Sequence, residues 1–369
     1  MGMFKAMAKS AATLGAAVMA LACIAPPAQA QDLLVRGATV ATASARGNVE
    51  DADVLVQGGI IRAVGRGLSA PAGVPVVEAK GRTLTPALFG GITEIGIEEV
   101  SGESSTVDSA LKIGEQPLRP EFDVTLAYNP ASVLIPVARL DGIGFTALGA
   151  ATGGGFVAGQ GGVVRFDGSA DPIGPRALFL RLGAAASELT GQSRAAQWML
   201  LQQMVDEARG QVAADSPHAL LTPAGRRTLA RYLSGQGRIV VEVDRAADIR
   251  QLLRWAAREK VKIAVAGGSA GGYLALMVGL SDDKTGPGGD PTAKHSAKVS
   301  AVIDMYGVVS FAKRGKGEVP GTSPAEQAAY LPESQCDAQD PAVLILHGTA
   351  DSTVDIAQSD DMAKALRFA

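Results

Sequence analysis

The sequence predicts an α/β protein that begins with a small all-β segment. Three observations predict this fold class. Short apolar runs separated by turn residues fill residues 32–85, strand-like and helix-like runs alternate from residue 86 onward, and a glycine-rich turn at 267–272 joins a strand-like run to a helix-like one. Strands that alternate with helices favour a parallel sheet or a barrel.

Residues 31–85 are expected to form a small β-rich domain with a sandwich-like sheet. Gly58-Gly59 separates two of its apolar runs, and such a pair is typical of a two-residue hairpin turn. Strands are predicted at residues 33–37, 52–57, 60–65, 74–78 and 83–85.

Residues 86–260 are expected to form a mixed β/α domain, and residues 261–369 a further one. In the first of these, strands are predicted at 144–148 and 162–166, around a glycine-rich loop, and at 238–243, with helices at 194–211, 226–233 and 246–259. The helix at 194–211 has the clearest pattern, because apolar residues recur at helical spacing, namely Trp198, Leu201, Met204 and Val205. In the last part, strands are predicted at 263–266, 299–306 and 342–346, helices at 273–278, 324–330 and 355–368, and a polar loop at 282–296.

The first thirty residues have the pattern of a secretory signal peptide. Lys5 and Lys9 precede a short apolar stretch at 11–25, and Ala28-Gln29-Ala30 offers a small-residue cleavage site. Cleavage after Ala30 predicts a periplasmic or secreted protein without a membrane span, and an uncleaved membrane anchor is the alternative. Only Cys336 remains after cleavage, so no disulfide within the chain is expected.

The charge balance excludes several classes of partner. The chain has 34 basic and 37 acidic residues, a net charge of −3, which gives no reason to expect binding to nucleic acid or anionic lipid. Aromatic residues make up 4% of the chain, too few to indicate a stacking platform for bases or sugars. We expect a small-molecule substrate and no cofactor, and the sequence leaves the oligomeric state open.

The turn at 267–272 has the layout of a nucleophile elbow. It reads Gly-Gly-Ser-Ala-Gly-Gly between the predicted strand and helix, with Ser269 at the nucleophile position. Side chains at Gly267 and Gly271 are expected to collide with the neighbouring strand and helix. The amides of Ala270 and Gly268 are the predicted oxyanion donors. A phosphate-binding loop is the alternative, but the segment lacks both the Lys-Ser/Thr ending and the Gly-x-Gly-x-x-Gly spacing.

Residues 32–262 resemble the amidohydrolase superfamily. The resemblance rests on Gly81-Arg82-Thr83-Leu84-Thr85-Pro86-Ala87-Leu88 and on the later Gly159-Gln160-Gly161-Gly162-Val163-Val164. It implies a partial (β/α) barrel beside the small sheet. The family's His-x-His metal motif is replaced here by Ile92-Thr93-Glu94, and Glu94 alone cannot hold a catalytic zinc. We therefore predict no metal site. An acidic cluster follows and is expected to be a solvated loop: Glu98, Glu99, Glu103 and Asp108.

Residues 261–369 resemble the α/β-hydrolase superfamily, in particular its acetyl-esterase and hormone-sensitive-lipase-like carboxylesterases. The residues that carry the resemblance are 263–272, Tyr306-Gly307 and 346–354. The resemblance implies a partial hydrolase sheet in which Ser269 is the nucleophile and Asp351 is the acid of the catalytic triad.

The histidine that should follow the acid is missing from residues 352–369. The three histidines of the chain stand elsewhere. His347 is expected to order its loop, His295 lies in the polar loop, and His218 is expected at the surface. The alternative for His347 and His295 is that one of them acts as the base.

The two resemblances meet at residues 259–268, which indicates a fusion or chimera of two incomplete domains. The predicted function is that of an exported serine hydrolase acting on carboxylic esters, weak or inactive because the triad histidine is absent. The alternative is an amidohydrolase-like protein without its metal site, acting as a binding or scaffold module. A third interpretation is that the chain does not fold as one unit.

Overall fold

The computed structural model describes residues 32–44, 46–112, 118–152, 155–183, 190, 193–243, 245–262, 264–281, 299–309, 323, 327–328 and 330–368. The chain divides into two compact units. One comprises residues up to 90 with 135–146 and 165–170, and the other comprises 91–134, 147–164 and 171 onward. Mixed sheets and helices confirm the α/β class. Within the described ranges, we find no helix that is both long and apolar enough to cross a bilayer.

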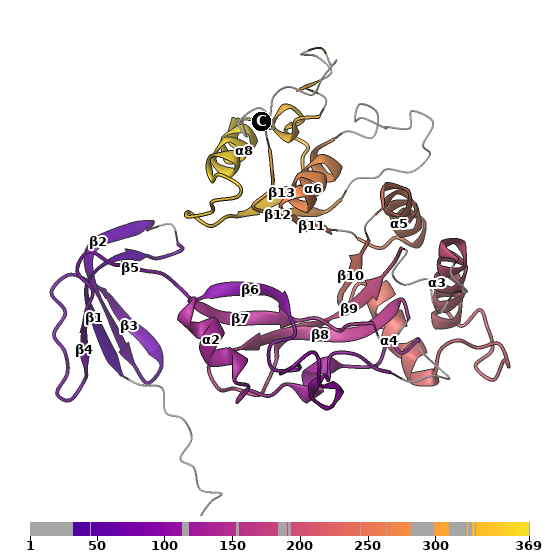
Figure 1. The fold of residues 1–369 in the computed structure, drawn as a ribbon, viewed down its shortest axis with the longest axis horizontal. Coiled ribbons are helices and arrows are strands. Elements are labelled where there is room, and N and C mark those ends of the chain that lie inside the picture. Colours follow the sequence, from indigo (N-terminus) through magenta and orange to yellow (C-terminus); the bar gives the residue numbers. More distant parts are fainter. Residues whose placement is uncertain are drawn as a thin grey trace, which may run out of the picture. The chain divides into compact units, whose positions relative to one another are not determined.

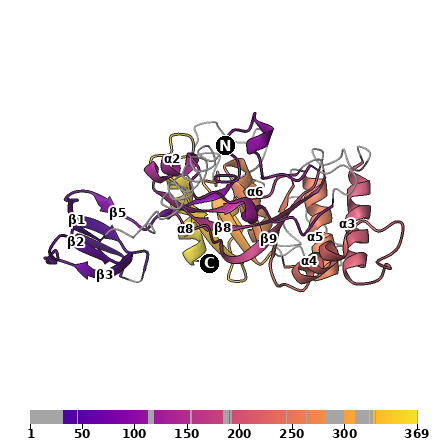
Figure 2. The same cartoon turned by 90° about the horizontal axis from the view of Figure 1, so that it is seen from below.

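The amino-terminal sheet follows the predicted pattern (Figure 2). Its strands are β1 (Leu33–Ala41), β2 (Asn48–Gln57), β3 (Ile60–Gly65), β4 (Val76–Glu78) and β5 (Thr83–Leu84). They lie in the order β3-β2-β1-β4, and β5 also pairs with β1. Gly58 and Gly59 have φ of 58° and 74°, the positive values that a tight hairpin turn requires. The predicted hairpin is therefore confirmed.

The second sheet has the order β10-β9-β8-β7-β6 (Figure 1). Its strands are β6 (Leu88–Thr93), β7 (Ile143–Leu148), β8 (Val157–Arg165), β9 (Ile173–Arg181) and β10 (Arg238–Glu242). The sequence analysis predicted neither β6 nor β9. Because β9 pairs antiparallel with β8 and parallel with β10, the sheet is mixed and not a simple parallel alternation.

Strand β8 begins at Val157, five residues before the predicted start, so the predicted loop is wrong for residues 157–161. A Cβ atom at Gly161 would overlap the carbonyl oxygen of Leu148, and Gly159 has φ of 124°. Glycine is needed here because two strand backbones approach closely, which is a recognised use of glycine inside sheets.

Three helices cover the apolar side chains of β8 and β9. These are α3 (Arg194–Ala208), α4 (Pro223–Leu233) and α5 (Ala246–Glu259), all of which the sequence predicted. The sequence analysis did not predict the shorter helix α2 (Leu134–Leu140) or the 3-10 turns Ser104–Thr106 and Val124–Ala127. Leu201, Met204 and Val205 of α3 are fully buried in this core, as their spacing predicts. Ser193 and Thr222 cap α3 and α4 by accepting hydrogen bonds from first-turn amides.

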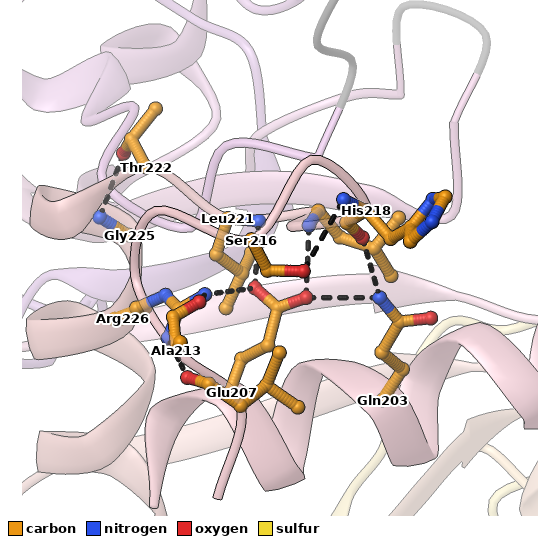
Figure 3. Close-up of polar contacts among 11 residues, drawn as sticks. Gln203, Glu207, Ala213, Ser216, His218, Leu221, Thr222, Gly225 and Arg226 are labelled. Atoms are coloured by element: carbon orange, nitrogen blue, oxygen red, sulfur yellow. Dashed lines mark hydrogen bonds and ion pairs between the residues drawn. The ribbon is translucent and has the colours of Figure 1, made fainter. Parts of the chain in front are cut away.

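A buried carboxylate fixes the loop between α3 and α4 (Figure 3). Glu207 accepts hydrogen bonds from Gln203 Nε2 at 3.0 Å and from the amide of Leu221 at 2.9 Å. Arg226 of α4 forms an ion pair with Glu207 at 3.3 Å, and the Glu207 side chain is completely buried. The charge is therefore compensated by a cation and by backbone donors, as a buried carboxylate requires. His218 lies exposed in this loop, as predicted.

The third sheet contains three parallel strands in the order β11-β12-β13. They are β11 (Ala264–Gly268), β12 (Ala301–Met305) and β13 (Ala342–Leu346). Helices α6 (Ala270–Leu280) and α8 (Ala357–Phe368) pack on one face of this sheet (Figure 1), and the 3-10 turn Pro332–Ser334 lies near them. The predicted polar loop 282–296, with His295, lies outside the described residues, as does most of the predicted helix 324–330.

Helix α5 belongs to both cores of the larger unit. Leu252, Trp255 and Ala256 are buried in the core beneath α3 and α4. Leu253, on the same helix, packs against the core of the third sheet. One amphipathic helix thus presents apolar side chains to two separate cores, which links the two parts of the chain that the sequence resemblances distinguish.

Candidate active site

Ser269 stands at a strained turn between β11 and α6. Its backbone has φ of 54° and ψ of −117°, a region that residues other than glycine rarely adopt. Its amide donates a hydrogen bond to the carbonyl of Met305 at 2.9 Å, and α6 begins at the next residue. A half-buried serine at the carboxyl end of a parallel strand, immediately before a helix, is the geometry of a nucleophile elbow.

Two positions around Ser269 leave no room for a side chain, and only one of them, Gly267, was predicted. A Cβ atom at Gly267 would overlap the carbonyl of Gly271, which confirms the expected collision. At Gly271 a Cβ atom would meet nothing within 4 Å, so the collision predicted there is wrong. Gly272 is the second required glycine, because its Cβ atom would overlap the carboxylate of Asp304 and lie 2.7 Å from the Cα of Gly307.

The predicted oxyanion donors flank the serine. Ala270 is the first residue of α6, so its amide belongs to the first turn, where amides have no partner within the helix. Gly268 is the last residue of β11 and lies opposite Met305 of β12. The positive end of the helix dipole adds to the stabilisation of an anion at this place.

Asp351 follows β13 and caps its own turn. Its Oδ1 atom accepts hydrogen bonds from the amides of Thr353 at 2.7 Å and Val354 at 2.9 Å. Its Oδ2 atom lies 3.6 Å from Nε2 of His347. Because β11 and β13 are separated by β12, the strands that precede Ser269 and Asp351 are two strand spacings apart, roughly 10 Å. A proton relay between them needs a bridging group.

His347 cannot supply that bridge in its observed contacts. The ring is 3% exposed, and Nδ1 contacts the hydroxyl of Ser359 at 2.6 Å. Nε2 lies 2.8 Å from the carbonyl oxygen of Val354, which can only accept, so Nε2 carries a proton. Both ring nitrogens are therefore engaged between β13 and α8, as expected for a residue that orders its loop.

Asp304 is a buried carboxyl group that the sequence analysis did not select as a site residue. It lies on β12 and is 0% exposed. Its Oδ1 atom accepts a hydrogen bond from the amide of Gly307 at 2.9 Å, and its Oδ2 atom has no hydrogen-bond partner among the described residues. Burial raises the pKa of Asp304, and the Gly307 hydrogen bond and the nearby His347 oppose this shift. One sequence feature could have identified Asp304 as a site residue: it is an acidic residue within the otherwise apolar run that ends at Met305.

The positions that match the amidohydrolase metal motif do not fit a metal. Ile92 lies on β6 with 58% of its surface exposed and offers only a hydrocarbon side chain. Burial raises the pKa of Glu94, and the negative charge of Glu98 adds to this shift. Among the described residues, no group of three or more histidine, cysteine, aspartate or glutamate side chains could hold a metal ion.

Comparisons with known proteins divide the chain in a similar way. Residues 246–366 match the family model described as BD-FAE, an esterase-like domain, and this match begins at the first residue of α5. A dihydroorotase from Pelobacter propionicus is 44% identical over 57 residues, which are 15% of this chain and 13% of the dihydroorotase. The chain thus spans a small fraction of the curated relative that it matches.

Three solved structures illustrate what this chain is similar to. An amidohydrolase from Thermotoga maritima MSB8 covers 91% of this chain and 83% of its own, with 18% identity and a TM-score of 0.57. Thermogutta terrifontis esterase 2 covers 40% of this chain and 63% of its own, with 30% identity and a TM-score of 0.29. A truncated carbohydrate esterase from gut microbiota covers 33% and 54%, with 24% identity and a TM-score of 0.28.

Both sequence resemblances are confirmed. The carboxy-terminal part is esterase-like, and most of the chain shares its fold with an amidohydrolase, in agreement with a curled, partly barrel-like second sheet. The amidohydrolase likeness concerns the fold alone.

Proposed function

We propose that residues 246–368 carry a serine hydrolase site for carboxylic esters, with Ser269 as the nucleophile and Asp351 as the acid. The observation that carries this proposal is the backbone of Ser269, held at φ of 54° between β11 and α6. Strain of this kind persists only where the surrounding structure enforces it, and it is concentrated at functional sites. The esterase-like family match over the same residues supports the same chemistry.

The reaction would proceed by acyl transfer. Ser269 Oγ attacks the carbonyl carbon of the ester and passes its proton to a base from solution, while the carbonyl oxygen takes the electron pair and becomes an oxyanion beside the Ala270 amide. The oxyanion then re-forms the carbonyl, and the alcohol leaves with a proton. Water attacks the acyl-serine in the same way and releases the carboxylic acid and free Ser269.

The weak point of this site is the base that receives the serine proton. His347 is engaged on both ring nitrogens, and His218 lies exposed in the loop between α3 and α4. Residues 352–369 contain no histidine, and His295 lies outside the described residues. Loss of the general base costs several orders of magnitude in rate. We therefore propose that ester hydrolysis by these residues is slow and that free imidazole in solution accelerates it.

The test is the hydrolysis of p-nitrophenyl acetate by the full chain, with and without added imidazole. Ser269→Ala removes the nucleophile and also measures the direct reaction of imidazole with the ester. Ser300→Ala is the matched control, because this exposed serine precedes β12 at the opposite end of the sheet. We expect the unmodified chain and Ser300→Ala to hydrolyse the ester faster than Ser269→Ala does. The difference in rate should be larger when imidazole is present. Equal rates for the chain and Ser269→Ala would refute the proposal.

A second candidate function is favoured by the fold likeness to an amidohydrolase over 91% of the chain. Because Ile92 stands where a metal-binding histidine is expected, this part of the chain would act as a binding or scaffold module without metal chemistry. Elemental analysis of the purified protein tests this candidate. One equivalent of zinc that survives dialysis would contradict it.

A further inference from the structure

Tyr306 lies where the carboxyl ends of all three strands of the third sheet meet. It follows β12, the central strand, and its amide donates a hydrogen bond to the carbonyl of Leu346, the last residue of β13, at 2.8 Å. Its ring stands edge-on to the ring of His347, with centroids 6.4 Å apart. Its hydroxyl oxygen lies 2.9 Å from the point that a Cβ atom would occupy at Gly268, the last residue of β11.

The hydroxyl of Tyr306 is therefore beside the residue that precedes Ser269. Consecutive Cα atoms are 3.8 Å apart, so an ester carbonyl in contact with Ser269 is within reach of a group that touches Gly268. The residue is 43% exposed, which leaves the ring accessible to a ligand. Among the described residues, no side chain or backbone group forms a hydrogen bond with this hydroxyl.

The backbone of Tyr306 is strained. Its φ is 47°, and a bulky residue with positive φ is a genuine outlier. Glycine would adopt this conformation without cost, so the position retains an aromatic side chain against its backbone preference. The amide bond to Leu346 and the contacts with Gly268 and His347 hold the residue in place.

We propose that Tyr306 is a substrate-contacting residue of the ester hydrolase site, whose hydroxyl donates a hydrogen bond to an oxygen of the ester bound at Ser269. This inference rests on the proposed function. In open α/β sheets, ligands bind outside the carboxyl ends of the strands, and Tyr306 occupies the middle of that edge between the strand of Ser269 and the strand of Asp351.

The test compares Tyr306→Phe with Tyr330→Phe in the full chain. Both tyrosines are 43% exposed, and both replacements remove one hydroxyl while they keep the ring. The hydrolysis of p-nitrophenyl acetate in imidazole is measured for both, together with the chain itself and Ser269→Ala, and thermal unfolding is recorded for each protein. We expect Tyr306→Phe to lower kcat/KM by about fivefold to tenfold, the effect of one neutral hydrogen bond. Tyr330→Phe should leave it unchanged, and all unfolding midpoints should agree.

The outcomes separate the two proposals. If Ser269→Ala is as active as the chain, the proposed function fails and this inference fails with it. If Ser269 is required but Tyr306→Phe matches the chain, the proposed function stands and the role of Tyr306 is refuted. A loss of activity in Tyr306→Phe that comes with a lower unfolding midpoint also counts against the role, because it indicates a packing effect.

Discussion

Two adjacent glycines of α6 should respond to alanine in opposite directions. At Gly272, a Cβ atom would overlap the carboxylate of Asp304 and lie 2.7 Å from the Cα of Gly307, where carbon atoms prefer a separation of about 3.5–4.0 Å. The turn at Gly307 must therefore move by about 1 Å, and overpacking of this kind costs about 1–3 kcal/mol. At Gly271, a Cβ atom would meet nothing within 4 Å.

The helical preference of alanine adds about 0.5–1 kcal/mol of stability at both positions. Gly271→Ala should therefore stabilise α6 by that amount, and Gly272→Ala should destabilise it by about 1–2 kcal/mol. The two variants should differ by about 2 kcal/mol, roughly a 30-fold ratio in an equilibrium constant.

Hydrogen exchange measures this difference where it arises. Amide exchange of peptides that cover residues 264–281, followed by mass spectrometry, reports the free energy of local opening. The amides of α6 should exchange more slowly than in the unmodified chain for Gly271→Ala and faster for Gly272→Ala. Equal destabilisation by both replacements would refute the placement of α6 against Asp304 and Gly307.

Three further predictions concern other parts of the molecule. Glu207→Gln breaks the ion pair with Arg226 and should lower the free energy of unfolding by about 3–5 kcal/mol in urea titrations. Glu242→Gln breaks an exposed ion pair with Arg181 and should lower it by at most about 1 kcal/mol. Equal unfolding midpoints for the two variants would contradict the buried pair. Because burial raises the pKa of Asp304, its carboxyl group favours the folded state when protonated, and this stability is lost as the pH rises through the folded-state pKa. The free energy of unfolding of Asp304→Asn should therefore rise relative to that of the unmodified chain as the pH increases from 4 to neutrality. A difference in unfolding free energy that does not change with pH would count against the buried carboxyl group. Burial raises the pKa of the Cys336 thiol to about 11, so its alkylation by iodoacetamide at pH 8 should be about 100-fold slower in the folded protein than in urea, and equal rates would refute this assignment.

The sequence predicted those strands whose signal is local. Residues 60–65 and 342–346 form strands at the predicted positions, because each is an apolar run bounded by turn residues. Strand β9 was missed because Gly174, Pro175 and Arg176 interrupt its apolar pattern near its start. Its pairing with the preceding strand β8 and with β10, which is distant in the chain, overrides that local signal.

Glycine was the most difficult residue type to interpret. At 159–161 the sequence predicted a loop, whereas these glycines lie in β8 and permit close contact between strands. In the elbow, the requirement for glycine lies at Gly272 and not at Gly271, because the obstacle is the Asp304 carboxylate on β12. Such obstacles lie on elements that are remote in sequence, so the pattern of glycines alone does not locate them.

The site residues show the same limit. Ser269 and Asp351 could be placed at the carboxyl ends of two parallel strands because each follows an apolar run within a recognisable motif. Asp304, Tyr306 and the two hydrogen bonds of His347 depend on the meeting of three strand ends with α6 and α8. This meeting is a property of the folded sheet, and no local pattern encodes it.

The predicted export and the fusion of two incomplete domains stay predictions. Helix α5, which ends where the predicted junction at 259–268 begins, supplies apolar side chains to both cores of the larger unit. Amino-terminal sequencing of the mature protein tests export, with a first residue at position 31 as the expected result.

The central claim is that Ser269 is a nucleophile toward acyl-like electrophiles. The most direct measurement is peptide mass spectrometry after incubation with a p-nitrophenyl phosphonate ester in the presence of imidazole. We predict one phosphonate adduct, on the peptide that contains Ser269, and none on that peptide in Ser269→Ala. An unmodified Ser269 peptide, or adducts spread over exposed serines such as Ser300, would contradict the claim.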